Sequence, residues 1–136
     1  MLAPMSSIAL KILCSLAGAF GAATILFAWF AYSQGLLSSY DAGTVSLKIV
    51  GTVVRSAFLL LCAWAAWRQP HNAALYALAA FLAFVIGGAA DEVYRRGLVG
   101  GFGNLIPTYY FTSAIHGLFA LAVWRLAPKA AAVAVG

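Results

Sequence analysis

One long apolar stretch of this chain carries a positive charge near its centre. Residues 44–67, TVSLKIVGTVVRSAFLLLCAWAAW, are apolar enough to cross a lipid bilayer, and Arg55 lies among them. At about 1.5 Å per residue, Arg55 is roughly 16 Å along a span that must cross about 30 Å of hydrocarbon. An ionised side chain near the midplane costs from about 2.5 to more than 10 kcal/mol. We therefore expect Arg55 to face other helices or a hydrated cavity.

The composition indicates an integral membrane protein without a separate soluble domain. Of the 136 residues, 65% are hydrophobic and only 8% are charged, whereas roughly 25% of the residues of a soluble domain are charged. The net charge of +5 does not predict binding to nucleic acid, because the eight lysines and arginines are scattered among apolar runs. The expected partner is the lipid bilayer.

Four apolar segments predict an all-α membrane protein, in which four transmembrane helices form one antiparallel bundle and a single domain. The expected spans are residues 8–32, 44–67, 73–93 and 107–127, followed by a disordered tail over 128–136. Pro4 is expected to keep the first helix from extending far toward the N-terminus. Thr44 or Ser46 is expected to cap the second helix, and Asn72 the third. The glycine-rich residues 97–106 suit an interfacial loop better than a fifth span.

Small residues line one face of the first segment and one of the third. The first face has Cys14, Gly18 and Gly21, and the third segment has a stripe of Ala73, Ala77, Ala80 and Gly87. Because small side chains allow close approach of another helix, this pattern predicts a homo-oligomer or an accessory subunit of a larger membrane complex. Cys14 and Cys62 lack the spacing of a metal site or a redox motif. We expect both to be small buried residues that form no disulfide.

Polar side chains recur at helical spacing in the second and fourth segments. Lys48, Thr52, Arg55 and Cys62 form a seam along the second segment, and a face of the fourth carries four polar residues. Antiparallel packing of these two helices would bring His116 near the depth of Arg55. No metal ligands are expected and no cofactor is assigned. The candidate ligand-binding residues are Arg55, His116, Thr52, Ser113, Thr112 and Tyr109, with Asp91 and Glu92 at the outer side.

Two interpretations of Asp91 and Glu92 remain open. Each acid precedes an arginine by four residues, Arg95 or Arg96, which is the favourable order for an ion pair within a helix. The third helix would then protrude into the headgroup region with its charges neutralised. Alternatively, Asp91 continues the stripe of small residues and turns inward, toward the seam that contains Arg55.

The distribution of loop charges predicts the orientation in the membrane. With four spans, both termini and the second loop share one side. That side holds four basic residues and no acid: Lys11, Arg68, Arg125 and Lys129. The other side holds all three acids and three basic residues: Asp41, Asp91 and Glu92, with Lys48, Arg95 and Arg96. Because lysine and arginine are favoured on the cytoplasmic side, we expect cytoplasmic N- and C-termini.

The biochemical role stays open among three interpretations, and so does the question of whether the chain is an enzyme. Arg55 and His116 can hydrogen-bond each other and the nearby hydroxyls, and so fix helix register in a self-associating or accessory subunit. The same groups can bind a lipophilic anion, a lipid headgroup or a quinone-like molecule in a carrier or membrane enzyme. His116 can also act as a pH-responsive group. A b-type haem would need two copies of His116 across a symmetric dimer, because His71 lies in a loop.

The order of these features resembles that of small four-span bacterial membrane proteins of unknown function with a DoxX-like hydropathy pattern. The resemblance covers LKILCSLAGAFGAATILFAWFAYSQGL, VVRSAFLLLCAWAAWR with its mid-helix arginine, FLAFVIGGAADEVYRRGL and AIHGLFALAVWRL. It implies the four-helix fold in a bacterial cytoplasmic (inner) membrane and assigns no activity. Such families often carry an acid in the last helix, where this chain has His116. They often carry a basic residue near the end of the third, where it has Asp91 and Glu92.

Overall fold

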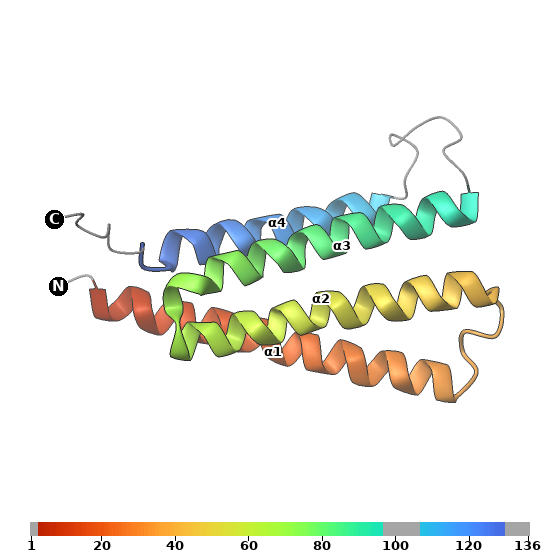
Figure 1. The fold of residues 1–136 in the computed structure, drawn as a ribbon, viewed down its shortest axis with the longest axis horizontal. Coiled ribbons are helices and arrows are strands. Elements are labelled where there is room, and N and C mark those ends of the chain that lie inside the picture. Colours follow the sequence, from red (N-terminus) through yellow and green to blue (C-terminus); the bar gives the residue numbers. More distant parts are fainter. Residues whose placement is uncertain (1–2, 97–106, 130–136) are drawn as a thin grey trace, which may run out of the picture.

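The structure is a computed structural model that describes residues 3–96 and 107–129. In these two ranges the regular structure is all helical (Figure 1), with the elements α1 (Ala3–Ser33), α2 (Ala42–Arg68), the 3₁₀ turn η1 (Pro70–Asn72), α3 (Ala73–Arg96) and α4 (Pro107–Leu126). Three of the helices, α1, α2 and α3, are long and apolar enough to cross a membrane. The first half of α4 is rich in polar and aromatic residues, which lowers its hydropathy below that of the other three.

Two helix starts differ from the sequence expectation. α1 begins at Ala3 instead of residue 8, with Pro4 in its first turn, where a missing backbone N–H costs nothing. The cap of α2 is Asp41, whose carboxylate accepts hydrogen bonds from the Thr44 backbone N–H at 3.1 Å and hydroxyl at 2.7 Å. The prediction of Thr44 or Ser46 as the cap was wrong, because an acidic side chain one turn earlier reaches the same orphan donors.

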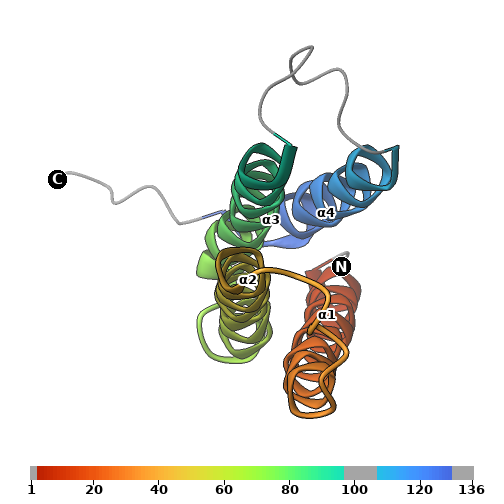
Figure 2. The ribbon, with the colours of Figure 1, turned by 90° about the vertical axis from the view of Figure 1, so that its right-hand side faces the viewer.

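The helices lie side by side in the order of the chain. α1 packs on α2, α2 on α3 and α3 on α4, and α4 has a smaller contact with α1; the view along the helices shows this order (Figure 2). α2 and α4 run in the same direction (Figure 1), so the antiparallel packing considered for these two helices does not occur, and α4 packs mainly on α3. The first turn of α1, η1 and the last turn of α4 share one end (Figure 1). We call it the basic end, and the opposite end, with Asp41 and Asp91, the acidic end.

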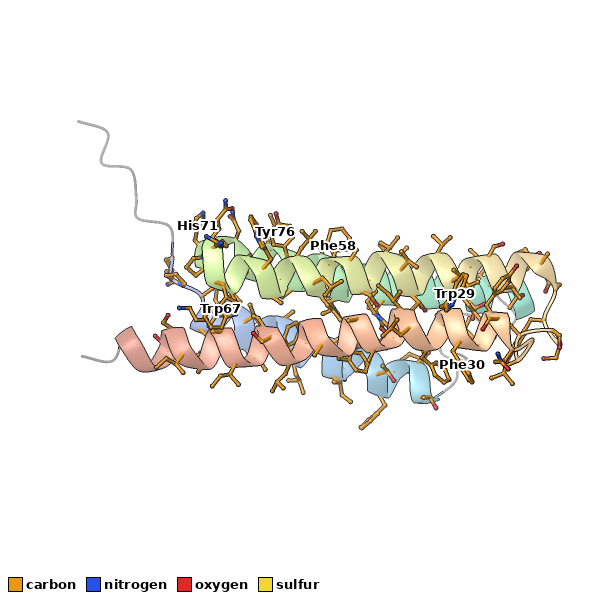
Figure 3. All side chains as sticks on the ribbon, turned by 90° about the horizontal axis from the view of Figure 1, so that it is seen from below. Trp29, Phe30, Phe58, Trp67, His71 and Tyr76 are labelled. Carbon is orange, nitrogen blue, oxygen red and sulfur yellow. The ribbon has the colours of Figure 1, made fainter. Side chains whose placement is uncertain are left out.

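Small side chains fill the interior, and large apolar side chains cover the surface. Trp29, Phe27 and Leu118 are 70%, 66% and 65% exposed, an arrangement that is unfavourable in water and expected in lipid. Trp29 lies toward the acidic end and Trp67 toward the basic end (Figure 3), as expected of aromatic residues at membrane interfaces. The buried apolar residues are Leu10, Cys14, Ala31, Leu59, Cys62, Ala65, Ala66, Ala73, Ala77, Ala80, Ala120 and Val123.

Both predicted faces of small residues are used inside the chain. A Cβ atom on Gly18 of α1 would lie 2.7 Å from the Ala63 Cβ of α2, so the two backbones approach closely. Nearby, the hydroxyls of Thr24 and Ser56 form a hydrogen bond of 2.8 Å between the same helices. Ala73, Ala77 and Ala80 of α3 are completely buried. These faces therefore hold the helices of one chain together.

Three sequence expectations concern parts of the chain that lie outside the described structure. They are the interfacial loop over residues 97–106, the tail beyond residue 129, and the pairing of Asp91 and Glu92 with the side chains of Arg95 and Arg96.

Candidate functional site

Arg55 lies at the middle of the 27-residue α2, between aromatic rings of two other helices. Its guanidinium carbon is 5.9 Å from the ring centroid of Phe20 on α1 and 5.7 Å from that of Phe84 on α3. Its Nε atom is buried and has no hydrogen-bond partner. No other described residue accepts a hydrogen bond from this side chain either. Within the described residues, the cation is thus contacted through ring faces and its N–H groups have no acceptor.

The two ring contacts, about 4 kcal/mol together, offset the lower part of the range of costs for this charge in a membrane and leave the upper part uncompensated. A desolvated cation–π contact contributes about 2 kcal/mol, and a central arginine costs from about 2.5 to more than 10 kcal/mol. A guanidinium also has five N–H donors in a fixed plane, and each donor left without an acceptor in hydrocarbon adds to the cost. Arg55 therefore requires an acceptor that the described residues do not provide, either water or an anion.

Two cavities next to Arg55 provide room for such an acceptor. One of about 320 Å³ lies between α2 and α3, and a smaller one of about 230 Å³ lies between α1 and α2. Lys48, Thr52 and Arg55 line both cavities, because they follow one face of α2. The α2–α3 cavity is completed by Leu47, Gly51, Ala83, Phe84, Gly87, Gly88 and Asp91.

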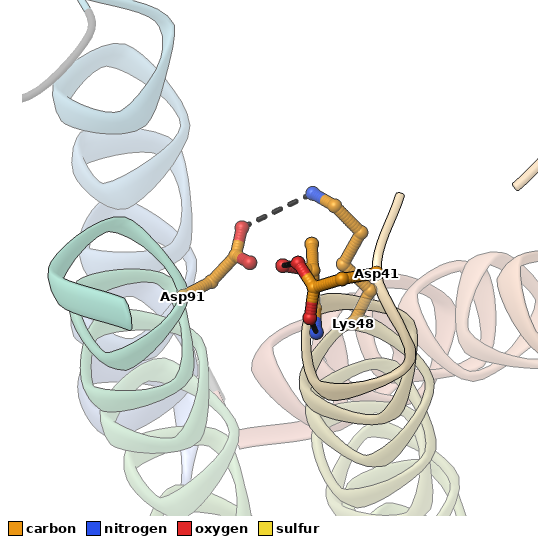
Figure 4. Close-up of polar contacts among 4 residues, drawn as sticks. Asp41, Lys48 and Asp91 are labelled. Carbon is orange, nitrogen blue, oxygen red and sulfur yellow. Dashed lines mark hydrogen bonds and ion pairs between the residues drawn. The ribbon is translucent and has the colours of Figure 1, made fainter. Parts of the chain in front are cut away.

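Lys48 and Asp91 form an ion pair across the acidic end of the α2–α3 cavity. Their Nζ and Oδ2 atoms are 3.1 Å apart, and the two side chains are 31% and 13% exposed; Figure 4 shows the pair beside Asp41. Asp91 thus turns inward toward the seam, as the second of the two sequence interpretations requires. Its carboxylate pairs with Lys48, which lies two helical turns before Arg55 on the same face of α2.

His116 contacts Phe84, which lines the α2–α3 cavity next to Arg55. Its imidazole is buried at the middle of α4 and stacks on the Phe84 ring, with the centroids 4.4 Å apart and the planes 7° from parallel. Nδ1 lies 2.9 Å from the carbonyl oxygen of Thr112, so a neutral ring donates from Nδ1 and keeps Nε2 as an acceptor. No hydrogen bond joins His116 to Arg55 in the described part of the chain. Phe84 contacts both residues instead.

Two hydroxyl groups of α4 donate hydrogen bonds to backbone carbonyls, one of α3 and one of α4 itself. Tyr109 donates to the Val85 carbonyl at 2.7 Å, and Thr112 donates to the Thr108 carbonyl at 2.8 Å. Ser113 Oγ is buried, and the Glu92 side chain is 4% exposed and lines neither cavity around Arg55. Of the eight residues expected at the site, the structure brings Arg55, Thr52 and Asp91 to one cavity. His116 and Tyr109 line neither cavity but both stack on Phe84 of the cavity wall, and Thr112, Ser113 and Glu92 line neither cavity.

Several residues of the site were absent from the sequence prediction. Lys48 belonged to the predicted seam but was not assigned to the site. Phe20 and Phe84 resembled lipid-facing aromatic residues of apolar segments. A signal for Phe84 does exist in the sequence, because Phe84, Gly88 and Asp91 recur at helical spacing and so share one face of α3.

Among residues 3–96 and 107–129, no group of three or more His, Cys, Asp or Glu side chains could hold a metal ion. Comparisons with protein-family models, with curated proteins and with solved structures found no match to this chain. The chemistry of the site is that of a cation, a hydroxyl and an ion pair at the wall of a cavity. Such a set can bind an anion through charge and hydrogen bonds.

Proposed function

We propose that this chain is a membrane protein that binds an amphiphile with an anionic headgroup at Arg55, as a carrier or a lipid-binding subunit does. The observation that carries the proposal is a guanidinium at the middle of an apolar helix, beside a cavity of about 320 Å³ and without an acceptor among the described residues. A carboxylate or phosphate accepts two parallel N–H groups from a guanidinium, in a bond about twice as strong as one between neutral groups.

The direction of the cavity supports an amphiphile as the ligand. Lys48, Thr52 and Arg55 extend over about 10 Å of α2, from the turns near its acidic end to its middle. A headgroup can follow these side chains inward while its apolar tail stays in lipid. The α2–α3 cavity, at about 320 Å³, is close to the smallest pockets that hold drug-sized ligands, which begin at about 300 Å³. This volume suits a headgroup with a few methylene groups. A quinone-like molecule is less well supported, because Lys48 is paired with Asp91 and the remaining cation, Arg55, favours an anion.

The proposal includes an arrangement in the membrane. α4 completes an antiparallel four-span bundle, and its polar first half is stabilised by packing against α3 instead of facing lipid. The chain lies in a bacterial inner membrane with both termini in the cytoplasm. The acidic end of the cavity then faces the outer leaflet, where the amphiphile enters.

Self-association, or assembly as an accessory subunit, is the second proposal. It is supported by a groove of about 460 Å³ along the α1–α2 contact, where Ala19, Ala22 and Ala63 leave room for another helix between larger residues. Ala22→Leu is expected to convert an oligomer to a monomer in light scattering and to leave lipid binding unchanged.

Retention of anionic lipid by the purified protein tests the first proposal. The protein is placed in phosphatidylcholine nanodiscs that contain phosphatidylglycerol in one series and oleate in another, and native mass spectrometry counts the retained ligands. Wild type is expected to retain one anionic amphiphile per chain. Arg55→Gln is expected to weaken retention by about tenfold to a hundredfold, because a charge-assisted hydrogen bond contributes about 1.5–3 kcal/mol. The series that binds identifies the headgroup as phosphate or carboxylate.

Arg125→Gln is the matched control, because Arg125 is an exposed arginine in the last turn of α4 that lines neither cavity. It should retain lipid as wild type does. Equal retention by Arg55→Gln and wild type, or equal retention of the zwitterionic lipid, would contradict the proposal.

A further inference from the structure

The two cysteines of the chain meet in the interior, toward the basic end. The Sγ atoms of Cys14 on α1 and Cys62 on α2 are 3.5 Å apart, and both residues are completely buried. Both are free thiols. Cys62 Sγ is also 3.4 Å from the carbonyl oxygen of Ala73, the first residue of α3. The sequence predicted the burial and gave no sign of the pairing, because the two residues are separated by 47 others.

The surrounding packing holds the two helices close at this level. Gly18 and Gly21 follow Cys14 on the same face of α1. A Cβ atom on Gly21 would lie 3.1 Å from the Ser56 carbonyl oxygen and 3.2 Å from the Leu59 Cβ. Disulfide formation needs a sulfur–sulfur distance of about 2.05 Å. The sulfurs, now 3.5 Å apart, must therefore approach by about 1.5 Å, which rotation of the two side chains can supply while the helices stay in contact.

We infer that Cys14 and Cys62 form a redox-active dithiol that is a modification site. A lipid-soluble organic disulfide oxidises this pair, and the resulting disulfide between Cys14 and Cys62 joins α1 to α2. One cysteine loses its proton and attacks a sulfur of the organic disulfide, which releases one thiol and leaves a mixed disulfide. The second cysteine then attacks the protein sulfur of that mixed disulfide and releases the other thiol. Two protons and two electrons pass from the cysteines to the organic disulfide, which becomes two thiols.

Burial selects the class of reagent. Because neither thiol is exposed and both lie in apolar spans, a reagent must partition into the membrane to reach them. The pair lines neither of the cavities next to Arg55, and Cys62 is two helical turns from Arg55 along α2, about 10 Å. The dithiol is therefore independent of the proposed anion site.

Reaction with 4,4′-dithiodipyridine in native membranes tests this inference, because each attack releases one coloured thiopyridone. Wild type is expected to release two thiopyridones per chain, to lose two hydrogens in intact mass, to remain monomeric on a non-reducing gel, and to recover both thiols with dithiothreitol. Cys62→Ala is expected to release one thiopyridone and to keep one pyridyl adduct, because no second thiol can displace it.

A matched control moves one thiol around the helix. In Cys14→Ala/Leu16→Cys the thiol moves by only about 3 Å along α1 but turns by about 200°, to the position of Leu16, which is 65% exposed, so two stable adducts and no disulfide are expected. Gel filtration of each variant checks that it is folded. Two adducts in wild type, a disulfide only between chains, or thiols that react in denatured but not in native protein would each overturn the inference.

Discussion

At the scale of single residues, Arg55 is a charge that the described protein does not satisfy by itself. Structural arginines in membranes pair with acids or backbone carbonyls. Here Asp91, the acid that lines the same cavity, is paired with Lys48, and among the described residues the Arg55 guanidinium has only the rings of Phe20 and Phe84. A side chain that only fixed helix register would be expected to have its hydrogen bonds complete. The anion that we propose as the ligand would supply the acceptors that the described residues lack.

Because Arg55 lacks an acceptor among the described residues, removal of its charge is expected to stabilise the ligand-free protein. In zwitterionic detergent without anionic lipid, Arg55→Leu is expected to raise the free energy of unfolding by about 1–4 kcal/mol, as replacement of buried charges by apolar residues does elsewhere. Denaturation with sodium dodecyl sulfate, followed by circular dichroism, measures the change. Arg125→Leu should stay within about 0.5 kcal/mol of wild type. A less stable Arg55→Leu would favour the structural role and remove the main support for anion binding.

The sequence predicted those features of the site that depend on one helix alone. The seam of Lys48, Thr52 and Arg55 follows from helical period alone, and the structure places these three side chains along the same cavities. The contacts of His116 did not follow, because they depend on which helix α4 packs against. A short connection favours packing of α4 on α3, but helical period does not say which residues of the two helices meet, so the stacking of Phe84 on His116 could not be predicted.

At the scale of elements, the start of α2 depends on Asp41. The Thr44 hydroxyl and backbone N–H donate to its carboxylate and hold the pKa of Asp41 below its ordinary value. The unfolded chain therefore binds this proton more readily than the folded chain. The contribution of the cap to stability is complete above about pH 4 and is lost as the pH falls through the lowered pKa of the folded state.

Asp41→Asn separates the geometry of this cap from its titration. Asparagine is an equally good N-cap, so the variant should be nearly as stable as wild type near pH 3 and differ most near pH 7. Asp41→Ala should be less stable at both values. Thermal unfolding midpoints at the two pH values measure the difference. If Asp41→Asn and wild type lose stability in parallel on acidification, another group is responsible for the acid sensitivity.

The contact between α1 and α2 depends on glycine at one position and not at another. Gly18→Ala would bring a Cβ atom within 2.7 Å of the Ala63 Cβ, so the helices must separate, with an expected cost of about 1–3 kcal/mol. Gly51→Ala is the control, because a Cβ atom there meets nothing within 4 Å and alanine favours a helix by up to about 1 kcal/mol. The free energy of unfolding in detergent should be higher for Gly51→Ala than for wild type and lower for Gly18→Ala. Equal values for Gly18→Ala and wild type would show that α1 and α2 can move apart at this contact without loss of stability.

At the scale of the whole molecule, the inside and outside are reversed relative to a soluble protein. Alanine, cysteine and small hydroxyl residues fill the interior, and tryptophan, phenylalanine and leucine face outward. Composition predicted the membrane environment, because no arrangement of 65% hydrophobic residues in 136 could bury them all. Composition could not decide whether the fourth helix crosses, because α4 combines an apolar second half with a first half that carries Tyr109, Thr112 and His116.

Whether α4 crosses the membrane determines where the C-terminus lies. The first turn of α1 and the last turn of α4 are at the same end of the molecule (Figure 1), the end that holds Lys11, Arg68, Arg125 and Lys129. If α4 crosses, this end faces the cytoplasm by the preference for lysine and arginine there. Alkaline phosphatase, which is active only in the periplasm, is then expected to be inactive when fused after residue 129 and active when fused after residue 100. Green fluorescent protein should give the opposite pattern. Active phosphatase at both positions would mean that α4 does not cross the membrane.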